Sequence, residues 1–249
     1  MFLLPPSYWK IRTTKEKGRG VFAARAISPG TIIGDYLGRV VRPEDDEETV
    51  NSLYGMHAHD AFVFSPNKET IGIHLINHSC MPNCAMYPYK GHILYIALRR
   101  IFPGEELTVS YMVEPAEVPD GLTYTCYCRT VLCQGTMVVS QERARAFWDV
   151  FVKKHMGTYY NHIGTPYGVE LPFLPEYPSV VADEFIYPLF GCSGQKPHVL
   201  RTTTLPHVSD IRTGIRETGR FLLIPALHCI ILGEANGVVV YRDMATKGK

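Results

Sequence analysis

Three cysteines in the middle of the chain are spaced like metal ligands. They are Cys126, Cys128 and Cys133. Thiolates this close in sequence can reach one tetrahedral zinc ion, which needs a fourth sulfur or imidazole from elsewhere. Cys80 is the first candidate for that ligand and Cys84 is the second, while three unrelated free thiols are the alternative. A zinc ion bound there would hold residues 112–138 against the loop 77–84 and would contribute directly to folding.

Two other stretches could hold and use a polar ligand. In the first, Gly18 and Gly20 allow the backbone to approach a ligand closely and to adopt unusual φ angles. In the second, the side chain of Asn77 supplies both a hydrogen-bond donor and an acceptor. Taken singly, the glycine pair is typical of a plain turn and Asn77 of a satisfied loop. The functional interpretation depends on their occurring together.

The order of these motifs resembles that of SET-domain protein lysine methyltransferases. The similarity extends over about residues 9–137, a little over half of the chain. The matching segments are Lys17-Gly18-Arg19-Gly20-Val21-Phe22-Ala23 with Ile27, Gly30 and Tyr36-Leu37-Gly38; Asn77-His78-Ser79-Cys80-Met81-Pro82-Asn83-Cys84; Gly104-Glu105-Glu106-Leu107-Thr108-Val109-Ser110-Tyr111; and the three cysteines, which resemble the post-SET motif. The ordered set is a far more specific signal than any one motif.

The resemblance implies a fold that is mainly β with short helices (α+β). It would be a SET-type β-clip of small sheets with a pseudoknot-like threaded C-terminal strand. The SET domain is expected at residues 9–111, and a linker with the post-SET zinc segment at 112–138. Residues 139–249 match no family known to us, and their apolar and aromatic content favours an unassigned α+β extension or small lobe over disorder.

Members of this family take the methyl group from S-adenosylmethionine, and the resemblance implies which residues contact it. These are Lys17, Gly18, Arg19, Gly20, Asn77, His78, Tyr111 and Met137. The glycine loop would meet the methionine end of the cofactor through main-chain groups, and His78 would meet the adenine through its backbone. Met137 would cover the adenine, and the zinc would be structural.

The implied reaction is an in-line attack by a neutral lysine amine on the methyl group. An unperturbed lysine has a pKa of about 10.4, so about one amine in 2,500 is neutral at pH 7, a deficit of about 4.6 kcal/mol. Burial in an apolar channel beside a sulfonium lowers that pKa, because desolvation and a like charge both disfavour the ammonium. Tyr111 would then orient the amine and the methyl group. Tyr36 is expected to line the same channel, with a less certain contribution from Tyr87.

Composition favours an intracellular enzyme over a nucleic-acid or membrane protein. The formal net charge is +1 and 20% of the residues are charged, so no global field attracts a polyanion, and no basic aromatic stripe supports a zinc-dependent nucleic-acid module. The apolar opening of the chain is too short for a signal peptide or membrane span. Seven cysteines, an odd number, suit thiolate ligation in a reducing compartment. The expected location is the nucleus or chromatin in a eukaryote and the cytoplasm otherwise.

Short apolar runs separated by glycine and proline predict a series of strands. They cover residues 9–12, 20–23, 31–37, 61–64, 71–76, 92–98 and 106–111. Helices are expected at residues 43–54, where the acidic run 44–48 suits a first turn or a docking patch for a basic substrate, and at residues 141–156, where apolar residues recur with helical spacing. Asn236-Gly237 is typical of a type I′ turn and predicts a hairpin.

The substrate is the least defined part of the hypothesis. A histone tail is the default protein substrate for this family. Val109 occupies a position where family members often carry an aromatic residue that helps to set the degree of methylation, so mono-, di- and trimethylation stay open. The alternative to an enzyme is a catalytically inactive SET-like binding or scaffolding module. The intact Tyr111, Asn77 and glycine loop favour the enzyme. The oligomeric state is not predicted.

Overall fold

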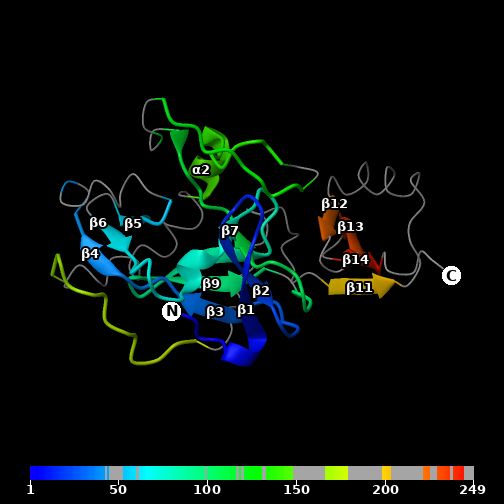
Figure 1. Ribbon diagram of the computed structural model, residues 1–249, viewed down its shortest axis with the longest axis horizontal. Coiled ribbons are helices and arrows are strands. Elements are labelled where there is room, and N and C mark those ends of the chain that lie inside the picture. The colour runs from blue at the N-terminus through cyan, green and yellow to red at the C-terminus, as the bar shows by residue number, and fades with distance from the viewer. Residues whose placement is uncertain are drawn as a thin grey trace.

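The computed structural model (Figure 1) describes residues 1–42, 44, 53–59, 62–98, 100–115, 118, 121–130, 133–147, 166–178, 198–202, 221–224, 229–235 and 238–243. Small, mostly antiparallel sheets with few helices make up this part of the chain, as the sequence predicted. None of the helices in it is both long and apolar enough to cross a membrane.

The first hairpin carries the glycine loop. Strands β1 (Trp9–Thr13) and β2 (Arg19–Ala23) pair antiparallel, following a short 3₁₀-helix η1 (Pro6–Tyr8). Gly18, with φ +67°, closes the turn between the strands, and the backbone N–H of Thr14 donates to the carbonyl of Gly18 at 2.7 Å. A positive φ is costly for residues with a side chain, so glycine suits this corner.

The central sheet holds most of the core. Its strand order is β3–β9–β8, formed by Ile32–Asp35, His92–Ala97 and Cys84–Tyr89. All six residues of β9 are buried, because this middle strand is covered on both faces. Figure 1 shows β3 and β9 side by side near the centre of the molecule.

A second sheet of three strands follows β3. Its order is β4–β6–β5, formed by Arg39–Val41, Phe62–Ser65 and Met56–His59. The edge of β4 that does not face β6 is covered by a later segment, residues 166–178, which we call the strap. The backbone N–H of Gly168 donates to Val40 O at 2.7 Å, and that of Leu171 to Gly38 O at 2.9 Å.

Two short parallel strands form the threaded part of the fold. Strand β7 (Asn77–His78) pairs with β10 (Thr108–Val109), with Thr108 opposite Asn77 and Val109 opposite His78. The side chain of Asn83 secures the arrangement, because its Oδ1 accepts the backbone N–H of Thr108 at 2.9 Å and its Nδ2 donates to Glu106 O at 2.8 Å. The two central motifs are therefore joined side by side.

The strand expected at residues 71–76 is absent, and this prediction was wrong. The segment instead contains a 3₁₀-helix, η2 (Ile73–Leu75). Residues i and i+3 lie on one face of such a helix, so Ile73 and Ile76 can both enter the core, where each is 1% exposed. The predicted helix 43–54 lies almost entirely outside the described residues.

The remaining elements lie C-terminal to Tyr111. Helix α2 is described over Gln141–Phe147, the start of the predicted helix 141–156, whose later part lies outside the described residues. A sheet of order β11–β14–β13–β12 comprises His198–Thr202, Val238–Asp243, Cys229–Ala235 and Phe221–Ile224. Strands β13 and β14 pair antiparallel with Ala235 opposite Val238, which confirms the predicted hairpin.

Candidate functional site

Asn77 lies where the glycine loop, β7 and the segment before β10 meet. Its Nδ2 donates to Arg19 O at 3.1 Å and to Glu106 Oε1 at 2.9 Å. The other carboxylate oxygen of Glu106 pairs with the ammonium group of Lys17. Glu106 thus connects the two segments that the sequence assigned to cofactor binding, although sequence reasoning gave Glu106 itself no role.

The close approach at Gly20 depends on its lack of a side chain. A Cβ at this position would lie 2.8 Å from Asn77 Nδ2 and 2.8 Å from Glu106 Oε1, closer than non-bonded atoms come. At Gly18 a Cβ would meet nothing within 4 Å. The two glycines therefore have different roles: Gly18 allows the left-handed turn, and Gly20 leaves room for the Asn77 amide.

The imidazole of His78 holds Tyr111 through a hydrogen bond and a ring contact. The backbone N–H of Tyr111 donates to His78 Nδ1 at 3.1 Å, and the two rings meet edge to face with 5.4 Å between centroids. The Tyr111 hydroxyl donates to Ile76 O at 3.3 Å. His78 is 6% exposed, and its imidazole holds the Tyr111 backbone, a role that the sequence did not predict.

Three tyrosines lie close enough to Tyr111 to interact with it electrostatically, namely Tyr36, Tyr54 and Tyr95. Tyr36 is 3% exposed and donates its hydroxyl to Tyr54 O at 2.7 Å, while its ring lies 5.9 Å from that of Tyr95. Burial, followed by the neighbouring Tyr54 and Glu106, raises the pKa of Tyr111 above its ordinary value. Burial, followed by Tyr111 and Tyr54, likewise raises the pKa of Tyr36.

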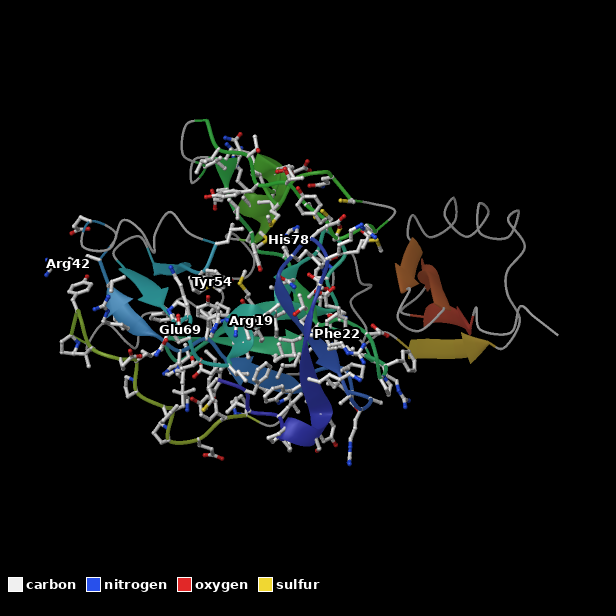
Figure 2. The ribbon with its side chains drawn as sticks, viewed as in Figure 1. Arg19, Phe22, Arg42, Tyr54, Glu69 and His78 are labelled. Carbon is white, nitrogen blue, oxygen red and sulfur yellow. The ribbon has the colours of Figure 1, made fainter. Side chains whose placement is uncertain are left out.

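The raised pKa values decide what these phenols can do. Both hydroxyls stay protonated at neutral pH, so they can donate and accept hydrogen bonds but are poor proton acceptors. An arrangement of neutral hydroxyls suits alignment of an incoming amine. Figure 2 labels three residues of this region: Arg19 of β2, Tyr54 of the turn before β5 and His78 of β7.

A second cluster brings together four sulfur atoms. Cys80 joins Cys126, Cys128 and Cys133, and their Sγ atoms all lie within 4.8 Å of one another. The Cys80 and Cys126 sulfurs are 3.6 Å apart, close to the separation of about 3.8 Å that tetrahedral zinc with Zn–S bonds of about 2.3 Å requires. Cys84 is buried elsewhere, with its Sγ 3.3 Å from Asn83 Oδ1.

Backbone N–H groups point at the sulfurs of this cluster. The N–H groups of Cys128, Gln134 and Gly135 each donate at 3.4 Å, to the Sγ atoms of Cys126, Cys80 and Cys133 respectively. Such donors stabilise thiolates. Hydrogen bonds from Cys80 and Thr130 lower the pKa of Cys128, and the shared proton raises the pKa of Cys80. Four sulfurs this close can all ionise only with a cation between them, so the donor set fits a structural zinc ion.

The two clusters touch through His78. Its Nδ1 accepts the Tyr111 N–H, and its Nε2 lies 3.7 Å from Cys80 Sγ. An ion pair between Arg129 and Glu16, 2.6 Å long, also joins the cysteine segment to the turn beside Gly18. The cysteine segment therefore closes over the glycine loop and the end of β10 from one side.

The other sequence-predicted residues have less defined places. The backbone N–H of Met137 donates to Tyr124 O at 2.7 Å, and the residue is half-buried. Tyr87 lies in β8, and its ring stacks on that of Tyr89 at 6.4 Å between centroids. Tyr54 and Tyr95 were missed by sequence reasoning. Tyr54 falls in the segment predicted as a helix, and Tyr95 has the ordinary pattern of a core strand.

The polar groups beside Gly20 also suit the cofactor that the sequence motifs imply. A Cβ at Gly20 would meet the amide of Asn77, the carboxylate of Glu106 and the methyl carbon of Thr14. These groups can bind a ligand that carries an ammonium, a carboxylate and a purine.

Comparison with known proteins identifies the middle of the chain. Residues 18–112 match the family described as SET domain. Histone-lysine N-methyltransferase ash1 of Drosophila melanogaster is 29% identical over 143 residues, and Histone-lysine N-methyltransferase TRX1 of Oryza sativa subsp. japonica is 34% identical over 133 residues. These alignments cover 53% and 48% of this chain but 6% and 13% of the relatives, so the chain spans a small part of their length.

A solved structure is similar over the same share of the chain. It is the crystal structure of KRYPTONITE in complex with mCHG DNA and SAH, with a TM-score of 0.45 and 23% identity, covering 52% of this chain and 28% of that one. The family match coincides with the region in which the structure joins the glycine loop, β7 and β10. Residues 18–112 of this protein are a SET domain.

Proposed function

We propose that this protein is an S-adenosylmethionine-dependent protein-lysine N-methyltransferase. The observation that carries the proposal is the placement of the Tyr111 hydroxyl. It belongs to a residue that His78 fixes beside the Asn77 loop and that interacts electrostatically with Tyr36 and Tyr54. The similarity to histone-lysine methyltransferases over half of the chain supports the same activity.

The chain's own residues would bind and align the reactants. Bound at the glycine loop, S-adenosylmethionine would supply the methyl group. Lys17, Gly18, Arg19 and Gly20 would hold its methionine end, Asn77 and His78 its adenine, and Met137 would cover it. The tyrosine-lined channel would admit a lysine stem and desolvate its amine, which lowers the amine pKa. The released proton would go to water.

Tyr111 and Tyr36 would act by alignment. Their protonated hydroxyls can accept a hydrogen bond from the incoming amine and thereby point its lone pair at the methyl carbon. The raised pKa of each phenol argues against a tyrosinate base in the pH range of enzymes. Deprotonation of the lysine before attack is then a property of the channel, because no basic side chain is required.

The zinc ion would be structural. Cys80, Cys126, Cys128 and Cys133 would complete a tetrahedral site with no open position, which is typical of ions that support folding. The ion would keep the cysteine segment against His78 and the glycine loop. A histone tail is the substrate that the names of the relatives suggest, which places the protein at chromatin in a eukaryotic cell.

The proposal is tested with purified protein, labelled S-adenosylmethionine and a pool of lysine peptides that includes histone tails. The wild type should transfer label to lysine, and Tyr111→Phe should lose most of the transfer while binding the cofactor normally. Tyr89→Phe is the matched control on an outer strand position and should stay active. Binding of lysine peptides without any transfer, under conditions that saturate the cofactor site, would favour the inactive binding module instead.

A further inference from the structure

The strap, residues 166–178, contacts the chain on both sides of Tyr36, although it lies outside the SET domain. On the C-terminal side, the N–H of Gly168 donates to Val40 O at 2.7 Å and the N–H of Val40 donates to Val169 O at 2.9 Å. The strap thus adds a short antiparallel partner to the edge of β4. In Figure 1 it runs in yellow-green from β4 along the lower side of the molecule toward β3.

Side chains of the strap secure this edge. Leu171 is 4% exposed and belongs to the hydrophobic core that also contains Tyr36 and Val40. The guanidinium carbon of Arg42 lies 4.4 Å from the ring centroid of Tyr167, a cation–π contact at the end of β4. The strap is therefore anchored at particular side chains, while most of its other residues are exposed.

On the N-terminal side of Tyr36, the strap reaches a buried carboxylate. The Tyr177 hydroxyl donates to Asp35 Oδ2 at 2.8 Å, and His92 Nδ1 lies 2.7 Å from the same oxygen. Asp35 is fully buried, and its other oxygen, Oδ1, has no hydrogen-bond partner within the described part of the chain. A buried carboxylate with few partners depends strongly on each of them, so Tyr177 matters here.

These contacts fix the backbone that carries Tyr36. Asp35 directly precedes Tyr36, and the N–H of Tyr36 donates to Ile93 O at 2.9 Å. The strap holds Asp35 on one side of Tyr36 and Gly38 to Val41 on the other. Tyr36 donates to Tyr54 O and lies close enough to Tyr111 for Tyr111 to contribute to its raised pKa. A shift of this backbone would therefore move a wall of the proposed channel.

We propose that the strap is part of the catalytic unit and that Tyr177 is a positioning residue for Tyr36, acting through Asp35. This inference rests on the proposed function, because it assigns Tyr36 to the lysine channel. It extends the functional unit from residues 18–112 to residue 178. The strap contacts described above all fall on residues 35–42. The proposed cofactor contacts come from residues 17–20, 77–78, 111 and 137, so the two sets should respond separately.

The test is Tyr177→Phe, which removes one hydroxyl and keeps the ring. At saturating cofactor and well below the melting temperature, kcat on a lysine peptide should fall by about tenfold or more, since small misplacements at a reacting centre are costly. The affinity for S-adenosylmethionine, measured by calorimetry, should stay within about twofold. Phe173→Ala, at a strap position that is 64% exposed, is the control and should change neither value.

The possible outcomes separate positioning from plain stability. An unchanged kcat in Tyr177→Phe overturns the proposal, and so does a parallel loss of kcat, cofactor affinity and melting temperature, which would indicate general unfolding. If Tyr177→Phe does not fold, Gly168→Ala replaces it, because Gly168 has φ +80° with open space around it and the substitution only loosens the strap's first turn.

Amide hydrogen exchange tests the positioning role of Tyr177 without any measurement of activity. In Tyr177→Phe the amides of Tyr36 and Leu37 should exchange faster than in the wild type, while those of Ser79 and Leu107 should not change. If the wild type transfers no methyl group at all, the proposed function fails, yet this exchange pattern still tests the strap. Equal exchange at Tyr36 in both proteins would refute the positioning role.

Discussion

Gly20→Ala probes the close packing between the glycine loop and Asn77. The new Cβ would lie 2.8 Å from Asn77 Nδ2 and 2.8 Å from Glu106 Oε1. Both atoms are the ends of side chains, so the backbone can stay in place and the fold should survive. The amide and the carboxylate, however, cannot keep their present positions, and the bonds from Asn77 to Arg19 O and Glu106 cannot both persist.

The expected cost follows from these bonds. A neutral hydrogen bond contributes about 1 kcal/mol and one to a charged group about 1.5–3 kcal/mol. Loss of one of the two therefore costs about 1–3 kcal/mol. If Asn77 holds the adenine end of the cofactor, that energy appears in binding, and each 1.4 kcal/mol is a factor of ten. The dissociation constant of S-adenosylmethionine should rise by about 5- to 150-fold.

Calorimetric titration of S-adenosylmethionine into the purified protein measures this change directly. Gly18→Ala is the matched control, two residues away in the same loop. Its φ of +67° makes alanine strained, but the space around a Cβ there is open. It should lower the melting temperature slightly, at a cost of about 1–2 kcal/mol, and leave Asn77 undisturbed.

The comparison of the two alanines decides whether the reasoning holds. Cofactor affinity in Gly20→Ala equal to the wild type, with the protein folded, would show that the Asn77 amide does not bind the cofactor or that the loop moves without cost. Equal losses of affinity in both variants would point to the turn conformation and away from the contact with Asn77. A loss in Gly20→Ala that clearly exceeds any loss in Gly18→Ala agrees with the structure.

Two further predictions concern the metal and the response to acid. Freshly purified protein should contain about one zinc ion per chain by elemental analysis. The variant Cys126→Ser should lose the ion, and Cys84→Ser should keep it. An equal loss of zinc in both variants would contradict the assignment of Cys80 as the fourth ligand. Burial, with the N-terminal amine and Arg19 nearby, lowers the pKa of His74 to about 4. As the pH drops, the unfolded state therefore binds the proton before the folded state does. The free energy of unfolding should fall between about pH 6.5 and pH 4. In urea denaturation at several pH values, His74→Gln should flatten this dependence between pH 6.5 and 5, and an unchanged slope would assign it to other groups.

The sequence pointed to residues that the structure brings together, but it did not predict the contacts that join them. Asn77, Tyr111 and the cysteines stand in short motifs, where type and spacing are visible directly. The pairing of Glu106 with Lys17 and Asn77 spans 89 and 29 residues, and no local pattern encodes such a contact. The fourth sulfur was open between Cys80 and Cys84, and only the folded chain brings Cys80 to the cluster.

The strap shows why other parts could not be predicted. Residues 157–190 are rich in tyrosine, proline and glycine without a period, and the strap binds β4 through backbone groups that every residue type except proline offers. No periodic spacing of apolar side chains therefore predicts where the strap lies. The error at residues 71–76 has a similar origin, because alternating apolar residues suit both a strand and a tight turn buried on one face.

The separation of Asp35 from Tyr177, 142 positions along the chain, has a consequence for biosynthesis. A ribosome completes the β4 edge long before it adds the segment that covers it. In the meantime the nascent polypeptide exposes unpaired N–H and C=O groups that can join a strand of a neighbouring molecule. Expression that stalls or is truncated before residue 178 should therefore yield aggregates, and chaperones that shield extended segments should raise the soluble yield.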